Sequence, residues 1–254
     1  MPKTIAICII TNKITEILKE LLSVLTAADF EIFIGLNGIS LESFEKEITK
    51  NENIKIFELE WEGYGATKNK LADLVNSNWI LSLDADEIPD DTLLNDIKNL
   101  DLENESIVYL LKRIQKIGIH SVRFGSYGME EWKPRLYHRN FASWNNDKVH
   151  EELVFEKNIK PQQLPGTLWH YTANSIQEIK EKNEHYALLS AQQMAEKGRK
   201  YTFFKPYFSG ITAFFKQYFI KKGFLDGAIG YRLAFEIARY SFNKYYFLKR
   251  FSKK

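Results

Sequence analysis

The stretch that decides the fold is Trp79-Ile-Leu-Ser-Leu-Asp84-Ala-Asp86-Glu87, an apolar run that ends in a group of carboxylates. The run from Trp79 to Leu83 is short and almost continuously apolar, which is typical of a parallel strand buried on both faces. In open sheets of such strands, ligands bind at the carboxyl ends. The acidic residues therefore stand where a parallel α/β sheet places its site.

Strand and helix patterns alternate through the residues that precede this stretch. Short apolar runs predict strands at Thr4–Thr11, Glu31–Leu36 and Ile54–Leu59, and helical spacing predicts helices at Ile14–Thr26, Leu41–Ile48 and Tyr64–Asn76. Strands that alternate with helices indicate a doubly wound sheet.

The rhythm changes after a further helix, which is predicted at Asp91–Leu100. Strand-like segments separated by loops follow at Ile107–Ile114, Arg135–His138 and Leu153–Phe155. A long helix is predicted at Ser175–Lys197, because Ser175 and Glu178 form a capping pattern at its start. The predicted fold class is therefore α/β, a doubly wound mixed sheet over residues 1–198 with a helical appendage at residues 199–254.

Composition places the chain among globular proteins. Its 254 residues are 44% hydrophobic and 27% charged, which argues against a disordered or an all-membrane chain. The one cysteine, Cys8, has no partner for an intramolecular disulfide and fits a reducing compartment. We find no signal peptide, and no apolar run of about 18 residues that predicts a spanning helix. An intracellular protein that contacts a membrane from the side is expected.

Charge and aromatic content are concentrated in the last part of the chain. From Arg199 onward there are 13 Lys and Arg against Asp226 and Glu236, a local charge of +11 within a total of +2. Half of the 36 aromatic residues also lie beyond position 200. Such a segment favours a helix lying in a membrane interface, with rings among the headgroups and cations against anionic lipid. The alternatives are aromatic packing on the main domain and nucleic-acid binding, and the acidic remainder argues against the latter.

The carboxylates after Leu83 suit a hard divalent cation. Asp84 and Asp86 have the period-two spacing that points side chains to one side of a strand, and Mg²⁺ or Mn²⁺ takes one or two carboxylates together with ligand phosphates. The alternative is an acidic turn that caps a helix beginning near Pro89. The apolar strand before Asp84 favours the metal site.

Five sequence blocks, in order along almost the whole chain, carry a resemblance to a known family. They are Trp61-Glu-Gly-Tyr-Gly-Ala-Thr-Lys68-Asn69, Trp79 to Glu87, Arg135-Leu-Tyr-His-Arg139 with Val149-His150-Glu151, Trp169-His170-Tyr171, and Gly223-Phe-Leu-Asp-Gly227. The chain resembles family 2 inverting glycosyltransferases of the GT-A fold, particularly the lipopolysaccharide and lipooligosaccharide core glucosyltransferase-like group.

The resemblance implies where a nucleotide-sugar donor binds. Asp84 and Asp86 would hold the metal and the donor diphosphate, Asp86 more directly. Lys68 looks like a donor contact with Asn69 beside it, although a solvated lysine early in a helix is the plain alternative. A UDP-sugar is the default donor, but the family's Asp-containing turn after the second strand is replaced here by Asn37-Gly38. Thr11 and Asn12 are the other candidate base or ribose contacts.

An inverting transfer needs a carboxylate that takes the proton of the acceptor hydroxyl. The resemblance makes Glu151 the first choice and Glu131 the second, and the alternative for either is a surface glutamate. His150 and His170 are candidate ligands of metal or diphosphate, because imidazole suits Mn²⁺ and hydrogen-bonds phosphate. Arg135 is a candidate contact of acceptor or phosphate, or else a partner of a nearby carboxylate.

The implied reaction transfers a hexose, glucose by default, to a lipopolysaccharide-core or other envelope-glycan acceptor. A lipid-linked saccharide acceptor would place the protein in the cytoplasm, peripherally on the inner face of the bacterial cytoplasmic membrane. Two alternatives stay open: a protein glycosyltransferase, and a catalytically silent membrane-associated binder of nucleotide or sugar.

Overall fold

The computed structural model describes residues 4–128, 130–145 and 151–251. It divides into two compact units, one of residues 1–113 and 131–170 and the other of residues 114–130 and 171–254. These divisions differ from the predicted boundary after residue 198. The reason is that helix α5 (Ile176–Glu196) packs along α7 (Gly227–Phe251), so it groups with the C-terminal helices.

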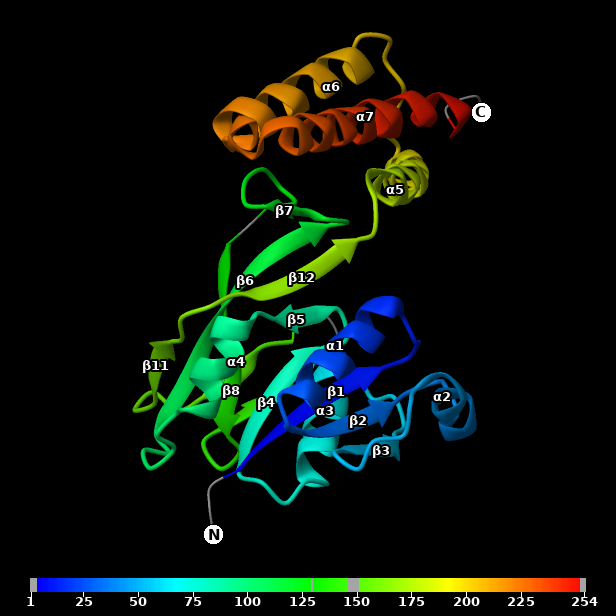
Figure 1. Ribbon diagram of the computed structural model, residues 1–254. Helices are drawn as coiled ribbons and strands as arrows, with labels where there is room; N and C mark the ends of the chain where they lie inside the picture. The colour runs from blue at the N-terminus through cyan, green and yellow to red at the C-terminus, as the bar shows by residue number, and fades with distance from the viewer. Residues whose placement is uncertain (1–3, 129, 146–150, 252–254) are drawn as a thin grey trace. The chain divides into compact units, whose positions relative to one another are not determined.

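The first unit is built on a mixed sheet (Figure 1). Its strands and helices in chain order are β1 (Ile5–Thr11), α1 (Glu16–Ala27), β2 (Glu31–Leu36), α2 (Leu41–Glu47), β3 (Ile54–Glu58), α3 (Tyr64–Asp73), β4 (Trp79–Asp84), β5 (Glu87–Pro89), α4 (Asp91–Lys98), β6 (Ile107–Ile117), β8 (Glu131–His138), β9 (Ala142–Trp144), β10 (Leu153–Phe155), β11 (Lys160–Gln163) and β12 (Leu168–Ala173). Both β6 and β12 run on into the second unit.

The sheet order is β3-β2-β1-β4-β8-β6-β12-β5. The four strands from β3 to β4 pair in parallel, whereas β8 pairs antiparallel with both β4 and β6, and β12 pairs antiparallel with β5. Of the remaining strands, β11 pairs with β6, and β9 and β10 form a separate pair. The predicted mixed α/β class is confirmed.

Alternating side chains of the central strands are buried on the two opposite faces of the sheet. Ala6, Cys8 and Ile10 share a core with Leu71 of α3 and Trp144 of β9. Because strand side chains alternate, the other residues of β1 point to the opposite face. There α1 contributes the buried residues Leu18, Leu21, Leu22 and Leu25. This two-sided burial explains why the strands of the first half are almost continuously apolar.

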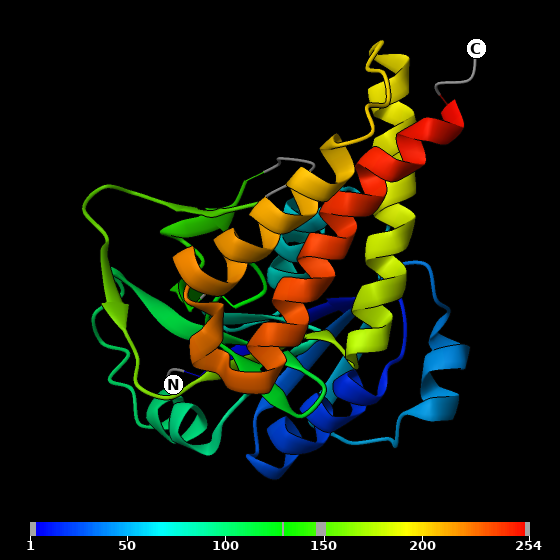
Figure 2. The same cartoon turned by 90° about the horizontal axis from the view of Figure 1, so that it is seen from above.

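The second unit is mainly helical (Figure 2). It contains β7 (His120–Val122), α5, α6 (Lys205–Phe215), the π-helical turn η1 (Lys216–Ile220), the short 3₁₀ helix η2 (Gly223–Asp226) and α7. Helix α7 packs against both α5 and α6. In the described parts of the chain, none of the helices has the length and hydropathy needed to cross a bilayer.

The sequence block Gly223–Gly227 has a structural role inside the second unit. The Asp226 carboxylate accepts hydrogen bonds from the backbone N–H groups of Arg123 and Phe124, the latter at 2.9 Å. A side chain at Gly230 would stand 1.9 Å from the carbonyl oxygen of Gly223, so the first turn of α7 and η2 approach backbone to backbone. The block therefore fixes the loop that enters α7.

Candidate active site

The carboxyl ends of β1, β2 and β4 meet at one edge of the sheet. In the parallel register Ile10 lies opposite Asp84, and the N–H of Asn37 donates to the carbonyl of Thr11 at 3.0 Å. The Thr11 hydroxyl donates to the carbonyl of Lys13 at 2.6 Å, while Asn12 is exposed beside it. The candidate nucleotide contacts Thr11, Asn12 and Asn37 are thus neighbours along the edge that carries Asp84.

Asp84 is held between two cations from distant parts of the sequence. Its Oδ1 accepts from Lys68 Nζ at 2.8 Å and its Oδ2 accepts from Arg135 at 2.5 Å. Burial alone would raise the pKa of this carboxyl, but the charges and hydrogen bonds of Arg135 and Lys68 outweigh burial and hold it well below its usual range. Asp84 is therefore ionised in the folded protein and holds the side chains of Lys68 and Arg135 in place.

Glu87 is the buried centre of this network and was not among the residues predicted from sequence. It has no exposed surface, and its Oε1 accepts from Arg135 at 2.6 Å and from Arg113 at 3.3 Å. Its Oε2 accepts from the N–H of Asp84 at 3.1 Å. Buried charge is retained only where it is paired. The signal available in the sequence was its place beside Asp84 and Asp86, yet nothing local indicated its cationic partners.

Lys68 is also buried, and its ammonium reaches a second carboxylate. It lies 3.4 Å from Glu151 Oε1 and 4.2 Å from the centroid of the Trp144 ring. The structure therefore brings the three predicted residues Lys68, Asp84 and Glu151 together. Trp144, which sequence reasoning missed, forms the apolar wall of this group.

Asn69 has a structural role that ties α3 to β9. Its side-chain amide donates to the Trp144 carbonyl at 2.8 Å and accepts from the Trp144 N–H at 2.9 Å. Gly65 belongs to the same contact, because a Cβ there would stand 1.9 Å from the backbone oxygen of Asn145. The block from Trp61 to Asn69 thus sets the position from which Lys68 reaches Asp84.

Glu131 lies farther along the same network. It accepts from Arg113 at 2.7 Å and from Lys133 at 3.1 Å. Burial acts to raise the pKa of this carboxyl, but the hydrogen bonds from Arg113 and Lys133 lower it. Glu131 is therefore held as a partner of Arg113 and Lys133, whereas Glu151 is the candidate base that lies beside Lys68 and Asp84.

Asp86 and His170 form a more open pair beside the network. The antiparallel pairing of β12 with β5 sets His170 opposite Glu87, which brings its Nε2 to 3.4 Å from Asp86 Oδ2. Half of the Asp86 side chain is exposed. The other candidate histidine, His150, lies outside the described residues.

A divalent cation fits the Asp86–His170 pair better than it fits Asp84. Both oxygens of Asp84 already accept from cations, whereas the pair offers one carboxylate and one imidazole, a donor set that Mn²⁺ accepts. Within residues 4–128, 130–145 and 151–251, no three His, Cys, Asp or Glu side chains are grouped to hold a metal. A cation here would thus need ligand phosphates to complete its shell.

A family model described as Glycosyl transferase family 2 matches residues 6–159, well over half of the chain. The match covers the strands, helices and loops that supply Lys68, Asp84, Arg135 and Glu151.

Several curated bacterial proteins are similar over most of their length. An uncharacterised glycosyltransferase of Rickettsia felis is 26% identical over 94% of this chain and 88% of its own, and one of Rickettsia typhi is 27% identical over 76% and 70%. The lipopolysaccharide core biosynthesis glycosyltransferase LpsC of Rhizobium meliloti is 28% identical over 72% and 67%.

Among solved structures, residues 1–349 of TarS from S. aureus, in complex with UDP-GlcNAc, align over 97% of this chain and 90% of that one. The sequence identity is 12% and the TM-score is 0.47.

Proposed function

The chain belongs to glycosyl transferase family 2, and we propose from that premise that it is a metal-dependent, inverting enzyme that transfers a hexose, glucose by default. The donor would be a nucleotide sugar, with a UDP-sugar as the default. The acceptor would be a lipopolysaccharide core or another envelope glycan, in keeping with the name of the Rhizobium meliloti relative.

The observation that carries the proposal is the convergence of Lys68, Asp84 and Glu151 beside the open pair of Asp86 and His170. Asp84 holds Lys68 and Arg135 in place at the carboxyl end of β4, where ligands of such sheets bind. The two cations offer preorganised positive charge to a donor diphosphate, and this kind of charge stabilises a leaving group without reorganisation.

Asp86 and His170 would hold the divalent cation, which, when bound, offsets the negative charge of the departing nucleoside diphosphate. Asp84 contributes indirectly, by fixing the cations that flank this position.

Glu151 is the proposed general base. The acceptor oxygen forms a bond to the anomeric carbon while the bond from that carbon to the diphosphate oxygen breaks, and the hydroxyl proton moves to Glu151. In the described part of the chain, Glu151 has one ion pair, the 3.4 Å contact with Lys68, which orients its carboxyl group. The attack comes from the face opposite the leaving group, so the configuration inverts.

The test is release of nucleoside diphosphate from a panel of nucleotide sugars with Mn²⁺ or Mg²⁺. Asp86→Ala is expected to abolish release while the protein stays folded, and Glu151→Gln to lower transfer by a factor of about 100 or more. Asp90→Asn is the matched control, because Asp90 caps α4 through its hydrogen bond to the N–H of Leu93, a role that asparagine can also fill. Turnover that is unchanged in Asp86→Ala would refute the metal assignment, and nucleotide binding without turnover by the native protein would indicate a silent binder.

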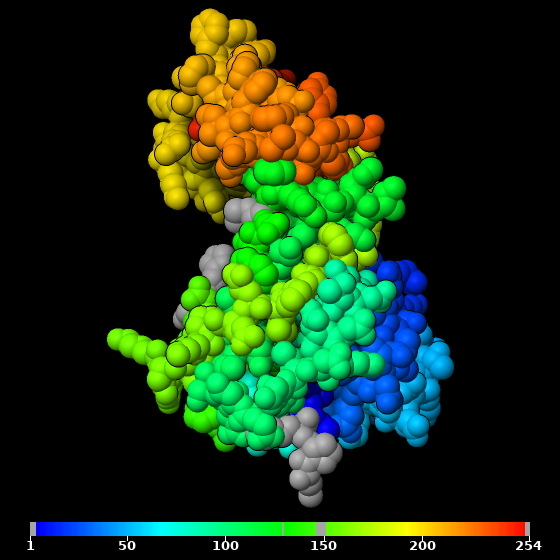
Figure 3. All heavy atoms as spheres, turned by 60° about the vertical axis from the view of Figure 1, so that its left-hand side comes forward, coloured from blue at the N-terminus to red at the C-terminus, as the bar shows by residue number. Residues whose placement is uncertain are grey.

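We propose in addition that the second unit attaches to membrane through α6, η1 and η2. These elements and the two residues that precede α6 carry many exposed apolar side chains: Phe203, Phe204, Tyr207, Phe208, Ile211, Phe215, Phe219, Ile220, Phe224 and Leu225. Figure 3 shows the segment, in gold and orange, covering the surface of the helical unit in that view. Exposed aromatic residues mixed with lysines suit the interface of an anionic bilayer.

Attachment is testable with a matched pair of substitutions. Leu225 and Leu74 are similarly exposed, at 54% and 48%, but lie in different units. Burying one leucine stabilises by about 1.5 to 3 kcal/mol, so Leu225→Glu should weaken vesicle binding about tenfold or more. Leu74→Glu should leave it unchanged, and equal effects of the two substitutions would contradict attachment through η2.

A further inference from the structure

The second unit contains a cavity that the transferase reaction does not use. It has a volume of about 230 Å³ and is lined by residues of α5, α7 and the segment that leads into α6. Met194 and Leu248 supply its apolar lining. Its polar lining residues are Arg199, Lys200, Thr202, Lys205 and Tyr245.

The cavity has an excess of positive charge. Arg199, Lys200 and Lys205 all line it, and none of its lining residues is acidic. In the part of the chain that the structure describes, none of the three cations has a carboxylate within 4.0 Å. Cations that are gathered without counter-charge repel each other, so an anion in the cavity would be bound favourably.

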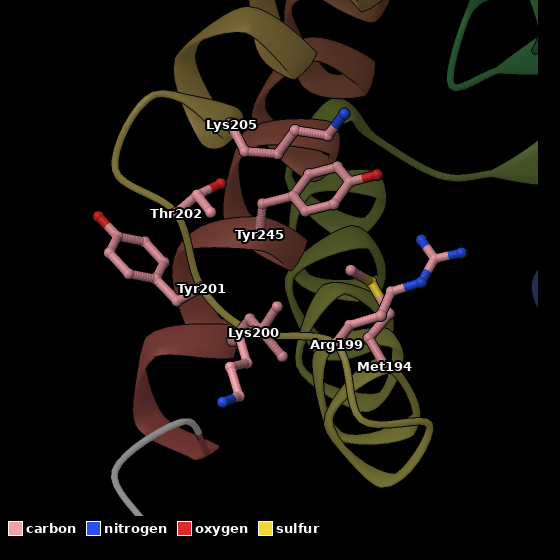
Figure 4. A pocket seen from close by; sticks show the side chains of 8 residues that line it. Met194, Arg199, Lys200, Tyr201, Thr202, Lys205 and Tyr245 are labelled. Atoms are coloured by element: carbon pink, nitrogen blue, oxygen red, sulfur yellow. The ribbon is translucent and has the colours of Figure 1, made fainter.

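Tyrosine rings and hydroxyl groups complete a set of donors. Lys205 Nζ lies 5.5 Å from the centroid of the Tyr245 ring, and Lys244 Nζ lies 5.2 Å from the same centroid. Figure 4 shows the Lys205 side chain lying across the Tyr245 ring, with Arg199 extending toward the same side. Guanidinium, ammonium, and the hydroxyls of Thr202 and Tyr245 are the donors that phosphate oxygens accept.

The surroundings of the cavity indicate the source of the phosphate. Thr202 and Lys205 directly flank Phe203 and Phe204, whose exposed fractions are 61% and 78%. A phosphate site beside exposed rings has the two parts of a lipid-binding surface, one for the headgroup and one for the acyl boundary. We propose that this cavity binds the phosphate group of an anionic membrane lipid. The inference rests on the membrane attachment proposed above, but not on the transfer reaction.

The test is flotation of the full-length protein with vesicles of phosphatidylcholine alone or with added phosphatidylglycerol. The variant is Arg199→Ala with Lys205→Ala, and the control is Lys157→Ala with Arg232→Ala, which removes the same charge at exposed positions outside the cavity. Cations near an anionic surface attract it, so the cavity variant, which lacks two of them, should bind the anionic vesicles about tenfold more weakly or worse. The control should lose less than about threefold, because its residues lie outside the cavity.

The possible results distinguish a phosphate site in the cavity from membrane attachment of the second unit as a whole. Equal losses in the two double variants would overturn the cavity site while leaving attachment intact, and no binding of the native protein to either vesicle would overturn both. Inhibition of vesicle binding by millimolar inorganic phosphate, equally in the native protein and the cavity variant, would also contradict a site in this cavity. Flotation needs no donor sugar, so absent turnover would count against the transferase proposal alone. Unfolding midpoints equal to the native one would show that a variant is folded.

Discussion

Replacing Glu87 by glutamine tests whether the buried network holds the site together. The substitution keeps the shape of the side chain and an acceptor oxygen, but removes the one charge that pairs with both Arg135 and Arg113. In the native protein the N–H of Asp84 donates to the Glu87 carboxylate at 3.1 Å, and the substitution places a neutral amide at this position.

The magnitude follows from burial. Glu87 has no exposed surface and Arg135 is almost fully buried, so the arginine cannot regain solvation when its partner loses charge. Removing one partner of a buried ion pair typically costs about 3 to 5 kcal/mol. Because Asp84 still pairs with Arg135 at 2.5 Å, we expect the lower end, about 3 kcal/mol.

The assay is urea unfolding followed by tryptophan fluorescence. All five tryptophans lie in the first unit, so the signal reports the unit that contains Glu87. Glu42→Gln is the control, because it removes the same charge from an exposed pair with Lys46, and such pairs contribute about 0 to 1 kcal/mol. If Glu87→Gln lowers the free energy of unfolding no more than Glu42→Gln does, the buried network does not stabilise the site.

Three further predictions follow from the same structure. Because the pKa of Asp84 is lowered in the folded protein, its stabilising contribution is fully present above the unfolded pKa of about 4 and is lost as the pH falls toward the folded pKa. The difference in unfolding free energy between the native protein and Asp84→Asn, measured by urea unfolding, should therefore be constant near neutral pH and become smaller below about pH 4. A difference that grows in acid would contradict the pairing. Gly65→Ala should destabilise the first unit by about 1 to 3 kcal/mol, because the new Cβ meets the backbone oxygen of Asn145, and a change within about 0.5 kcal/mol would show that the loop moves freely aside. Burial raises the pKa of the Cys8 thiol to about 12, so it should resist alkylation at pH 8 until the protein unfolds; rapid labelling of the folded protein would contradict this burial.

The first half of the fold was predictable because its signals are local. The strands β1, β2 and β4 are buried on both faces, so each reads as an apolar run, and the limits predicted for these strands and for β3 lie within two residues of the observed ones. The short strands β5 and β12 left no such signal. They exist because Leu168 to His170 pair with Glu87 to Pro89, a contact between segments about 80 residues apart in sequence.

Most residues of the candidate site could be named from the sequence, but the ion pairs that they form could not. The spacing of Asp84 and Asp86 after an apolar strand is a local pattern, and the resemblance added Lys68 and Glu151. The pairing of β4 with β8 brings Arg135 to Asp84, and the sequence of neither strand predicts that the two strands pair. For the same reason Asp84, expected to bind a metal, is observed between two cations, whereas Asp86 is half exposed and lies beside His170.

The central claim is that Asp86 and His170 bind a divalent cation together with the donor diphosphate. The most direct measurement is anomalous X-ray scattering from crystals grown with Mn²⁺ and UDP. We expect a manganese peak within about 2.0 to 2.3 Å of Asp86 and His170 that is also bonded to phosphate oxygens, and that is absent from crystals of Asp86→Ala. UDP bound at the ends of β1 and β4 with no manganese beside Asp86, or with manganese on other residues, would contradict the claim.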